Sequence, residues 1–220
     1  MVKINEKILE CDVLVVGGGI GGLMAAIAAA DGGAKVIVAE KSDTRRSGSG
    51  TTGNDHFNCY IPGVNTDSLD ECLKEFRQSM VGKGNYDVHI QRLFLDRSFE
   101  VVQDWHAWGI NMQPHGEWEF NGHAFPGRKR CFLKYDGRNQ KQVLTNEAKK
   151  RGVIIENKCP IRDFIVDDEG KIIGAVGISI KDTTPELKVF RAKAVVSCTG
   201  NTSRLYPSIT PPYLFNTAHT

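Results

Sequence analysis

The sequence predicts an α/β protein with a parallel sheet and a three-stranded antiparallel β-meander. Three observations lead to this fold class. A strand, a glycine turn, a helix and a second strand follow one another within residues 12–40. Helix patterns follow, and the last of them leads into an apolar strand at 153–156, as expected for a parallel sheet. From Ile161 the hydrophobic period becomes two, which indicates antiparallel strands.

The first strand, turn and helix carry the pattern Gly17-x-Gly19-x-x-Gly22. The apolar run 13–16 is typical of a buried parallel strand, and Gly17 allows a tight turn after it. Gly19 lacks a Cβ atom, so the backbone can approach a pyrophosphate, while Gly22 allows the next helix to pack close to the strand. That helix, over about residues 21–30, directs its N-terminal amides toward an anion.

The second strand, over residues 35–39, is followed by Glu40. Gly32 and Gly33 end the helix before it. A carboxylate at this position can accept hydrogen bonds from both ribose hydroxyls of an adenosine, and it disfavours a 2′-phosphate. Strand, glycines, helix, second strand and acid in this order predict a Rossmann-like dinucleotide site that does not take NADP.

The remaining elements follow from caps, periodicity and turn residues. Residues 41–63 form a long polar, glycine-rich segment, which indicates a binding loop. A helix is expected at 68–80 because Ser68-x-x-Glu71 forms a capping box. The other expected elements are helices at 87–108 and 139–151, a third parallel strand at 153–156, antiparallel strands at 162–166, 171–180 and 187–192, and a further apolar strand at 194–198.

Composition excludes several classes of function. The net charge of +2, from 28 basic and 26 acidic residues, gives no sign of nucleic-acid or membrane binding. No apolar stretch is long enough for an integral membrane segment, and residues 1–10 resemble no signal peptide, so a cytoplasmic location is expected. The six cysteines contain no C-x-x-C pair and are expected to be reduced thiols, with no metal site.

The chain resembles the FAD-binding flavoprotein subunits of the fumarate reductase and succinate dehydrogenase superfamily. Within that superfamily it is most similar to the alpha subunit of adenylylsulfate reductase and its relatives. The resemblance covers nearly the whole chain and implies a Rossmann-like FAD-binding fold. The residues that carry it are Gly17-x-Gly19-x-x-Gly22, Glu40-Lys41, the loop from Arg46 to Tyr60, and the strand end Cys198-Thr199-Gly200.

The resemblance also implies the residues that contact FAD. They are Gly17, Gly19, Ile20, Gly21 and Gly22 in the glycine turn; Glu40 and Lys41; Arg46, Ser47, Gly48, Thr52, Gly53, Asn54 and Asn58 in the following loop; Pro160 and Ile161 near the adenine; and Thr199 and Gly200. Family members with covalent flavin carry a histidine where this chain has Gly48, so noncovalent FAD is expected. His56 in the same loop is expected to be an ordinary polar side chain.

The expected function is that of an FAD flavoprotein subunit of a reductase or dehydrogenase acting on a small oxidised or unsaturated substrate. Electrons are expected to come from a separate iron–sulfur partner, because the chain has no cluster motif. Two alternatives stay open: a single-chain oxidase or dehydrogenase of the same superfamily, and a noncatalytic dinucleotide-binding module. No catalytic residue is assigned. The side chains that could exchange a proton, by their chemistry alone, are those of Asp104, His106, His115 and His123.

The domain organisation follows from the same resemblance. Family members continue beyond this segment into a capping domain. Residues 1–220 are therefore expected to form the N-terminal segment of an FAD domain, with a proline-rich tail at 207–220 and without the capping domain. Such a chain is expected to be incomplete for catalysis.

Overall fold

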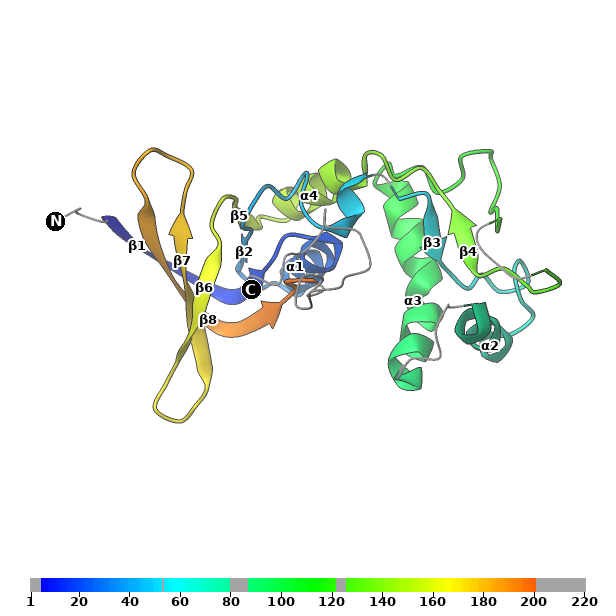
Figure 1. Cartoon of the computed structure of the whole chain (residues 1–220), viewed down its shortest axis with the longest axis horizontal. Coiled ribbons are helices and arrows are strands. Elements are labelled where there is room, and N and C mark those ends of the chain that lie inside the picture. The colour runs from blue at the N-terminus through cyan, green and yellow to red at the C-terminus, as the bar shows by residue number, and fades with distance from the viewer. Residues whose placement is uncertain (1–4, 53, 80–86, 122–125, 201–220) are drawn as a thin grey trace, which may run out of the picture. The chain divides into compact units, whose positions relative to one another are not determined.

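A computed structural model describes residues 5–52, 54–79, 87–121 and 126–200 (Figure 1). The chain divides into two compact units, the first formed by residues 1–52 and 140–220 and the second by residues 53–139. The expected proline-rich tail at 207–220, together with Gly53 and His123, lies outside the described residues.

A six-stranded sheet forms the centre of the first unit, in the order β5-β2-β1-β8-β7-β6. Strands β5, β2, β1 and β8 are parallel, whereas β8, β7 and β6 form an antiparallel meander (Figure 1). The predicted fold class is therefore confirmed. The strand bounds are β1 Asn5–Val16, β2 Val36–Ala39, β5 Ile154–Glu156, β6 Ile161–Val166, β7 Ile172–Ser179 and β8 Glu186–Ser197.

Strand β8 corrects the expectation of two separate strands at 187–192 and 194–198. It is continuous, and it pairs antiparallel with β7 through residues 186–191 and parallel with β1 along its whole length. No glycine or proline interrupts residues 186–197, so nothing stops the strand between its two halves. The long β8 also explains why β1 begins at Asn5 rather than near residue 13, since the first half of β8 provides a pairing edge from Asn5↔Glu186 onward.

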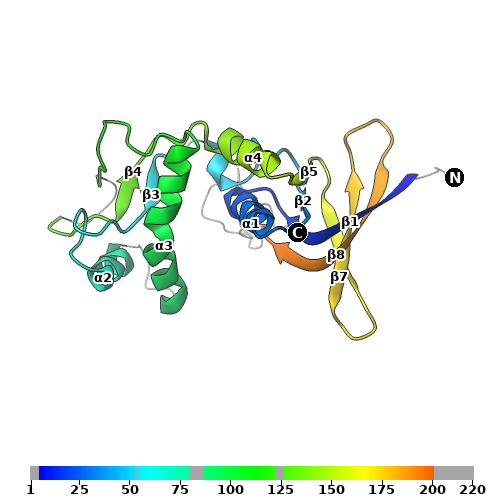
Figure 2. The same ribbon diagram turned by 180° about the vertical axis from the view of Figure 1, so that it is seen from behind.

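The first unit also contains the helices α1 (Ile20–Asp31) and α4 (Gln140–Lys150), which pack against each other (Figure 2). Helix α1 ends as expected, because the amide of Gly32 donates to Ala28 O and Gly33 has a φ of 84°. The core holds fully buried apolar side chains from strands and helices alike, among them Leu14, Val38, Leu23 and Leu144.

The second unit contains helices α2 (Leu69–Ser79) and α3 (Val88–Ala107) and a small antiparallel sheet of β3 (His56–Asn58) and β4 (Phe132–Lys134). The Ser68 cap is confirmed, because Ser68 Oγ accepts from the amide of Glu71. The carboxylate of Glu71 reaches back to the amide of Asp67, one residue before the N-cap. The two strands were not predicted, because three residues are too few for a period of two to stand out.

The long loop 41–63 is therefore less irregular than expected. It contains a 3-10 helix, η1 (Ser49–Thr52), and strand β3. Across the described residues, no helix combines the length and apolar character needed to cross a membrane.

Candidate functional site

The glycine turn between β1 and α1 is shaped by two glycines that the fold itself requires. Gly17 has a φ of +100°, and a Cβ atom there would lie 2.5 Å from the carbonyl oxygen of Cys198 at the end of β8. A Cβ atom at Gly22 would overlap the carbonyl oxygen of Gly17. Gly22 therefore allows the close packing of α1 on β1 that the pattern predicts, and Gly17 also allows the approach of β8, which was not predicted.

Gly19 differs from these two glycines because the protein's own packing does not require it. Among the described residues, and apart from its chain neighbours and the backbone of its own helix, no atom lies within 4 Å of the position that a Cβ atom would occupy at Gly19. Gly19 is also the N-cap of α1, and no side chain caps the helix there. The helix N-terminus thus faces open space, which is the arrangement that favours binding of an anionic group.

Glu40 lies directly after β2 and is 4% exposed. Its Oε2 accepts from the amide of Gly18 at 2.6 Å, and its Oε1 accepts from the amide of Ser42 at 2.8 Å. Its backbone is also held, by Glu156 on one side and Cys159 on the other. Each carboxylate oxygen has roughly two acceptor positions, so each retains about one for a ribose hydroxyl.

The loop after β2 returns over the glycine turn. Ser47 Oγ donates to the carbonyl of Gly18 at 3.4 Å, and a Cβ atom at Gly48 would lie 3.3 Å from the Cα of Gly19. Ser47 and Gly48 thus lie at the glycine turn, and their predicted contacts with FAD stay predictions. Arg46 and Lys41, also predicted contacts, are exposed.

Helix α4 contributes two side chains that the sequence reasoning missed. Lys141 Nζ donates to the carbonyl of Gly18 at 2.5 Å, and Gln140 Nε2 donates to the carbonyl of Gly50 at 2.7 Å. Both side chains are buried. A signal for Lys141 exists in the sequence, because its spacing to Leu144 and Ala148 places it on the buried face of the helix.

The environment of Lys141 perturbs its ionisation. Burial lowers the pKa of its ammonium group to about 8, although the nearby carboxylates of Glu40 and Asp43 favour the charged form. A partly desolvated cation beside the carbonyl of Gly18 adds positive charge to a turn that already presents a helix N-terminus. This combination suits a phosphate-bearing ligand.

The remaining predicted residues of the first unit lie at the end of β8 and the start of β6. The amide of Cys198 donates to Val16 O, which sets Thr199 and Gly200 directly after the strand end that packs on Gly17. The carbonyl of Pro160 accepts from the amide of Ile178, and Ile161 pairs with Gly177. The predicted contacts of Pro160 and Ile161 with adenine, and of Thr199 and Gly200 with FAD, stay predictions.

Asn54 and Asn58 belong to the second unit, and their contacts with a cofactor also stay predictions. Asn58 Oδ1 is buried and has no hydrogen-bond partner among the described residues. A buried carbonyl oxygen without a donor is unfavourable, so it is a group that a bound ligand could satisfy. Thr52 is the last residue of η1 in the first unit.

The three described candidates for acid–base chemistry, Asp104, His106 and His115, are exposed surface residues of the second unit. His115 Nδ1 lies 2.6 Å from Glu119 Oε2, so its ring is engaged in a surface contact with this carboxylate. Within the described ranges no group of three or more His, Cys, Asp or Glu side chains could hold a metal ion. No catalytic residue is assigned.

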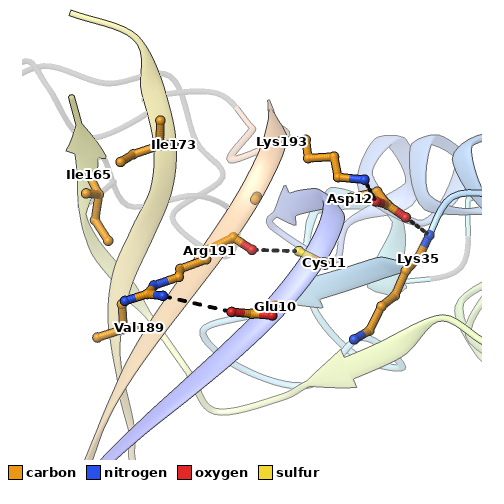
Figure 3. Close-up of a pocket in the computed structure, with 10 residues that line it drawn as sticks. Glu10, Cys11, Asp12, Lys35, Ile165, Ile173, Val189, Arg191 and Lys193 are labelled. Atoms are coloured by element: carbon orange, nitrogen blue, oxygen red, sulfur yellow. Dashed lines mark hydrogen bonds and ion pairs between the residues drawn. The ribbon is translucent and has the colours of Figure 1, made fainter. Parts of the chain in front are cut away.

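An open hollow lies elsewhere in the first unit, beside β1 and the meander (Figure 3). Its apolar lining includes Ile165, Ile173 and Val189. Lys193 Nζ lies 2.6 Å from Asp12 Oδ1, and Arg191 lies 3.9 Å from Glu10, so ion pairs between β1 and β8 form its polar side. These pairs support the strand pairing and present no convergent catalytic groups.

Comparison with known families gives one match that spans most of the chain. A family described as FAD binding domain matches residues 12–219. The glycine turn, Glu40 and the loop after β2 all fall within that range. The residues at the turn fit FAD, because Gly19 leaves open space at a helix N-terminus and Glu40 is buried at the end of β2.

Curated relatives are longer proteins. The chain is 26% identical over 210 residues to one subunit of the fumarate reductase (CoM/CoB) of Methanothermobacter marburgensis, covering 92% of this chain and 37% of that protein. It is 29% identical over 205 residues to the acrylate reductase flavoprotein subunit of Shewanella woodyi, covering 87% of this chain and 39% of that protein. The chain thus spans less than half the length of these relatives.

Solved structures show the same fold. The adenylylsulfate reductase of the hyperthermophilic Archaeoglobus fulgidus superposes with a TM-score of 0.73 at 24% identity, over 90% of this chain and 31% of that chain. The E. coli quinol fumarate reductase superposes with a TM-score of 0.74 at 23% identity, over 91% of this chain and 34% of that chain. The predicted resemblance to this superfamily is confirmed.

Proposed function

Because the chain belongs to the FAD binding domain family, we propose that it is the FAD-binding part of a flavoprotein reductase or dehydrogenase. The observation that carries the proposal is the open helix N-terminus at Gly19, bordered by buried Glu40 and buried Lys141. FAD is the cofactor of this family, and when bound it supplies a hydride acceptor or donor.

The chain's own residues have three tasks at this site. The glycine turn and the N-terminus of α1 bind the pyrophosphate, because the amides and the helix dipole favour an anion. Glu40 binds the ribose through its remaining acceptor positions. Lys141 holds the carbonyl of Gly18 and adds a positive charge to the turn.

Binding without a covalent bond to the flavin is part of the proposal. Gly48 occupies the position at which covalent members of the superfamily carry a histidine. Its φ is +78°, and a Cβ atom there would come within 3.3 Å of Gly19. A side chain at this position would be strained and crowded, which supports noncovalent FAD.

The proposed substrate is a small unsaturated acid. Fumarate and acrylate, named in the two relatives, share a carbon–carbon double bond conjugated with a carboxylate. Both relatives are subunits by name, so the proposal includes a separate electron-transfer partner of the iron–sulfur class. A cytoplasmic location is also part of the proposal.

The first experiment is the visible absorption spectrum of the purified protein, repeated on the supernatant after heat denaturation. We expect a flavin spectrum that appears in the supernatant, because noncovalent FAD is released when the fold is lost. Flavin retained in the pellet would contradict noncovalent binding. A colourless protein that also fails to quench the fluorescence of added FAD would contradict the proposed cofactor site.

A second experiment tests the substrate class. Because residues 1–220 alone are expected to be incomplete for catalysis, the test uses the FAD-loaded flavoprotein together with its capping domain. It is reduced with dithionite without oxygen and mixed with fumarate or acrylate, and flavin reoxidation is followed by absorbance. Succinate and propionate, which lack the double bond, are the matched controls. We expect reoxidation by the unsaturated acids only. A protein that binds FAD but is reoxidised by neither acid would favour the noncatalytic module.

A further inference from the structure

Three cysteines from separate segments meet in the core of the second unit. Cys59 follows β3, Cys72 lies in α2 and Cys131 precedes β4, and all three are buried. The Sγ atoms of Cys72 and Cys131 lie 3.5 Å apart, and the amide of Cys59 donates to the carbonyl of Cys131 at 2.9 Å. The proposed FAD site in the first unit does not use this cluster.

Polar contacts join the segment that carries Cys131 to the helix that carries Cys72. Lys129 Nζ lies 2.9 Å from Glu71 Oε1, and Arg128 Nε lies 3.2 Å from Glu75 Oε2. Asn65 Nδ2 donates to the carbonyl of Arg130 at 3.2 Å. Residues 128–131 are therefore fixed against α2 and the segment that leads into it. The proximity of the two thiols is thus determined by several independent contacts.

The surroundings distinguish the two thiols chemically. Cys72 lies in the first turn of α2, where the helix dipole favours a negative charge. Contact with Cys131 lowers the pKa of the Cys72 thiol despite its burial, and Asn65 Nδ2, 3.7 Å from the sulfur, acts in the same direction. Contact with Cys72 and burial raise the pKa of the Cys131 thiol. Cys72 is therefore the better nucleophile.

We propose that Cys72 and Cys131 are a modification site that forms a reversible disulfide when hydrogen peroxide oxidises the protein. The Cys72 thiol loses its proton, the thiolate attacks one peroxide oxygen and the O–O bond breaks. A sulfenic acid forms, and the leaving hydroxide takes up the proton to give the first water. The Cys131 thiol then attacks the Cys72 sulfur. The S–S bond forms, the S–O bond breaks, and water leaves with the remaining proton. Two thiols and one peroxide thus give one disulfide and two waters.

The bond requires a small movement. A disulfide has an S–S length of about 2.05 Å, so the two sulfurs must approach by about 1.5 Å. The product would tie α2 to the segment before β4. Cys59 is a poor competitor, because burial raises the pKa of its thiol to about 12.

The test is mass spectrometry of the native protein after treatment with hydrogen peroxide, with free thiols alkylated under denaturing conditions. We expect four of the six cysteines to be alkylated. We also expect a peptide in which a disulfide links Cys72 to Cys131. Dithiothreitol should restore six alkylated cysteines. Oxidation should also raise the melting temperature, since a disulfide constrains the unfolded chain.

Two variants complete the test. Cys72→Ala should abolish the linked peptide, whereas Cys59→Ala, which removes a neighbouring buried thiol, should retain it. The experiment on the unaltered protein decides the question even if a variant fails to fold. Six alkylated cysteines after peroxide treatment, or a linked peptide that contains Cys59 or joins two chains, would overturn the proposal.

Discussion

Glu40 and Lys141 hold opposite sides of one residue of the glycine turn, through the amide and carbonyl groups of Gly18. The carboxylate of Glu40 accepts from the Gly18 amide at 2.6 Å, and the ammonium group of Lys141 donates to the Gly18 carbonyl at 2.5 Å. Glu40 directly follows strand β2, and Lys141 lies in helix α4. The glycine turn is thus held in place by the protein itself, which reduces the ordering that a ligand must impose.

Replacing Glu40 with alanine should weaken FAD binding by roughly 1.5–3 kcal/mol, because a charged acceptor for the ribose is lost. The change should also lower the free energy of unfolding, since the amides of Gly18 and Ser42 lose their acceptor. Titration by quenching of FAD fluorescence measures the affinity. Glu169→Ala removes the same charge at an exposed turn and should leave affinity unchanged. Equal affinities of both variants would contradict the role of Glu40.

Gly19→Val should abolish FAD binding while the fold remains intact. The new side chain would enter the open space at the N-terminus of α1, where we propose that the pyrophosphate binds. Its Cβ would contact no atom of the described residues beyond its chain neighbours and its own helix. Gly22→Val should instead destabilise the fold, because its Cβ would overlap the carbonyl of Gly17. Thermal unfolding and flavin absorbance separate the two effects. Retained flavin in a folded Gly19→Val variant would place the phosphate elsewhere.

The free energy of unfolding should depend on pH through Lys141. Burial lowers its pKa to about 8 in the folded protein, whereas an unfolded lysine titrates near about 10.4. Between these values the unfolded state binds more protons, so this group makes the stability rise as the pH increases from about 8 to about 10.4. Urea unfolding at several pH values should show that the free energy of unfolding rises less with pH in Lys141→Met than in the unaltered protein. Lys149→Met, at an exposed position of α4, should retain the rise; equal slopes in both variants would refute the assignment.

Asp87→Ala should lower the free energy of unfolding by about 1 kcal/mol, with a range of roughly 0.5–2. Asp87 is the N-cap of α3, and its carboxylate accepts from the amides of His89 and Ile90 at 2.8 and 3.3 Å. Asp96→Ala, in the exposed middle of the same helix, should cause no such loss because alanine favours helix interiors. Chemical denaturation followed by circular dichroism measures both. If Asp87→Ala lowered the free energy of unfolding no more than Asp96→Ala does, the capping role of Asp87 would be contradicted.

The four helices were predicted with ends within one residue of those observed. Their ends depend on nearby groups, such as the Ser68 cap of α2 and the glycines after α1, and such groups can be read from a short stretch of sequence. Strands β1 and β8 were predicted less well. The first half of β1 mixes polar and apolar residues, and it becomes a strand because β8 pairs with it.

The sequence by itself determined the glycine turn, the acid that follows β2, and the helix caps, because each depends on residues close together along the chain. Only the tertiary structure decided that Lys141 reaches the carbonyl of Gly18, that Gly48 packs on Gly19, and that Cys72 lies beside Cys131. These contacts join segments far apart in the chain. They arise only when α4 packs on α1 and when α2 is fixed against residues 128–131, so packing rather than local pattern places them.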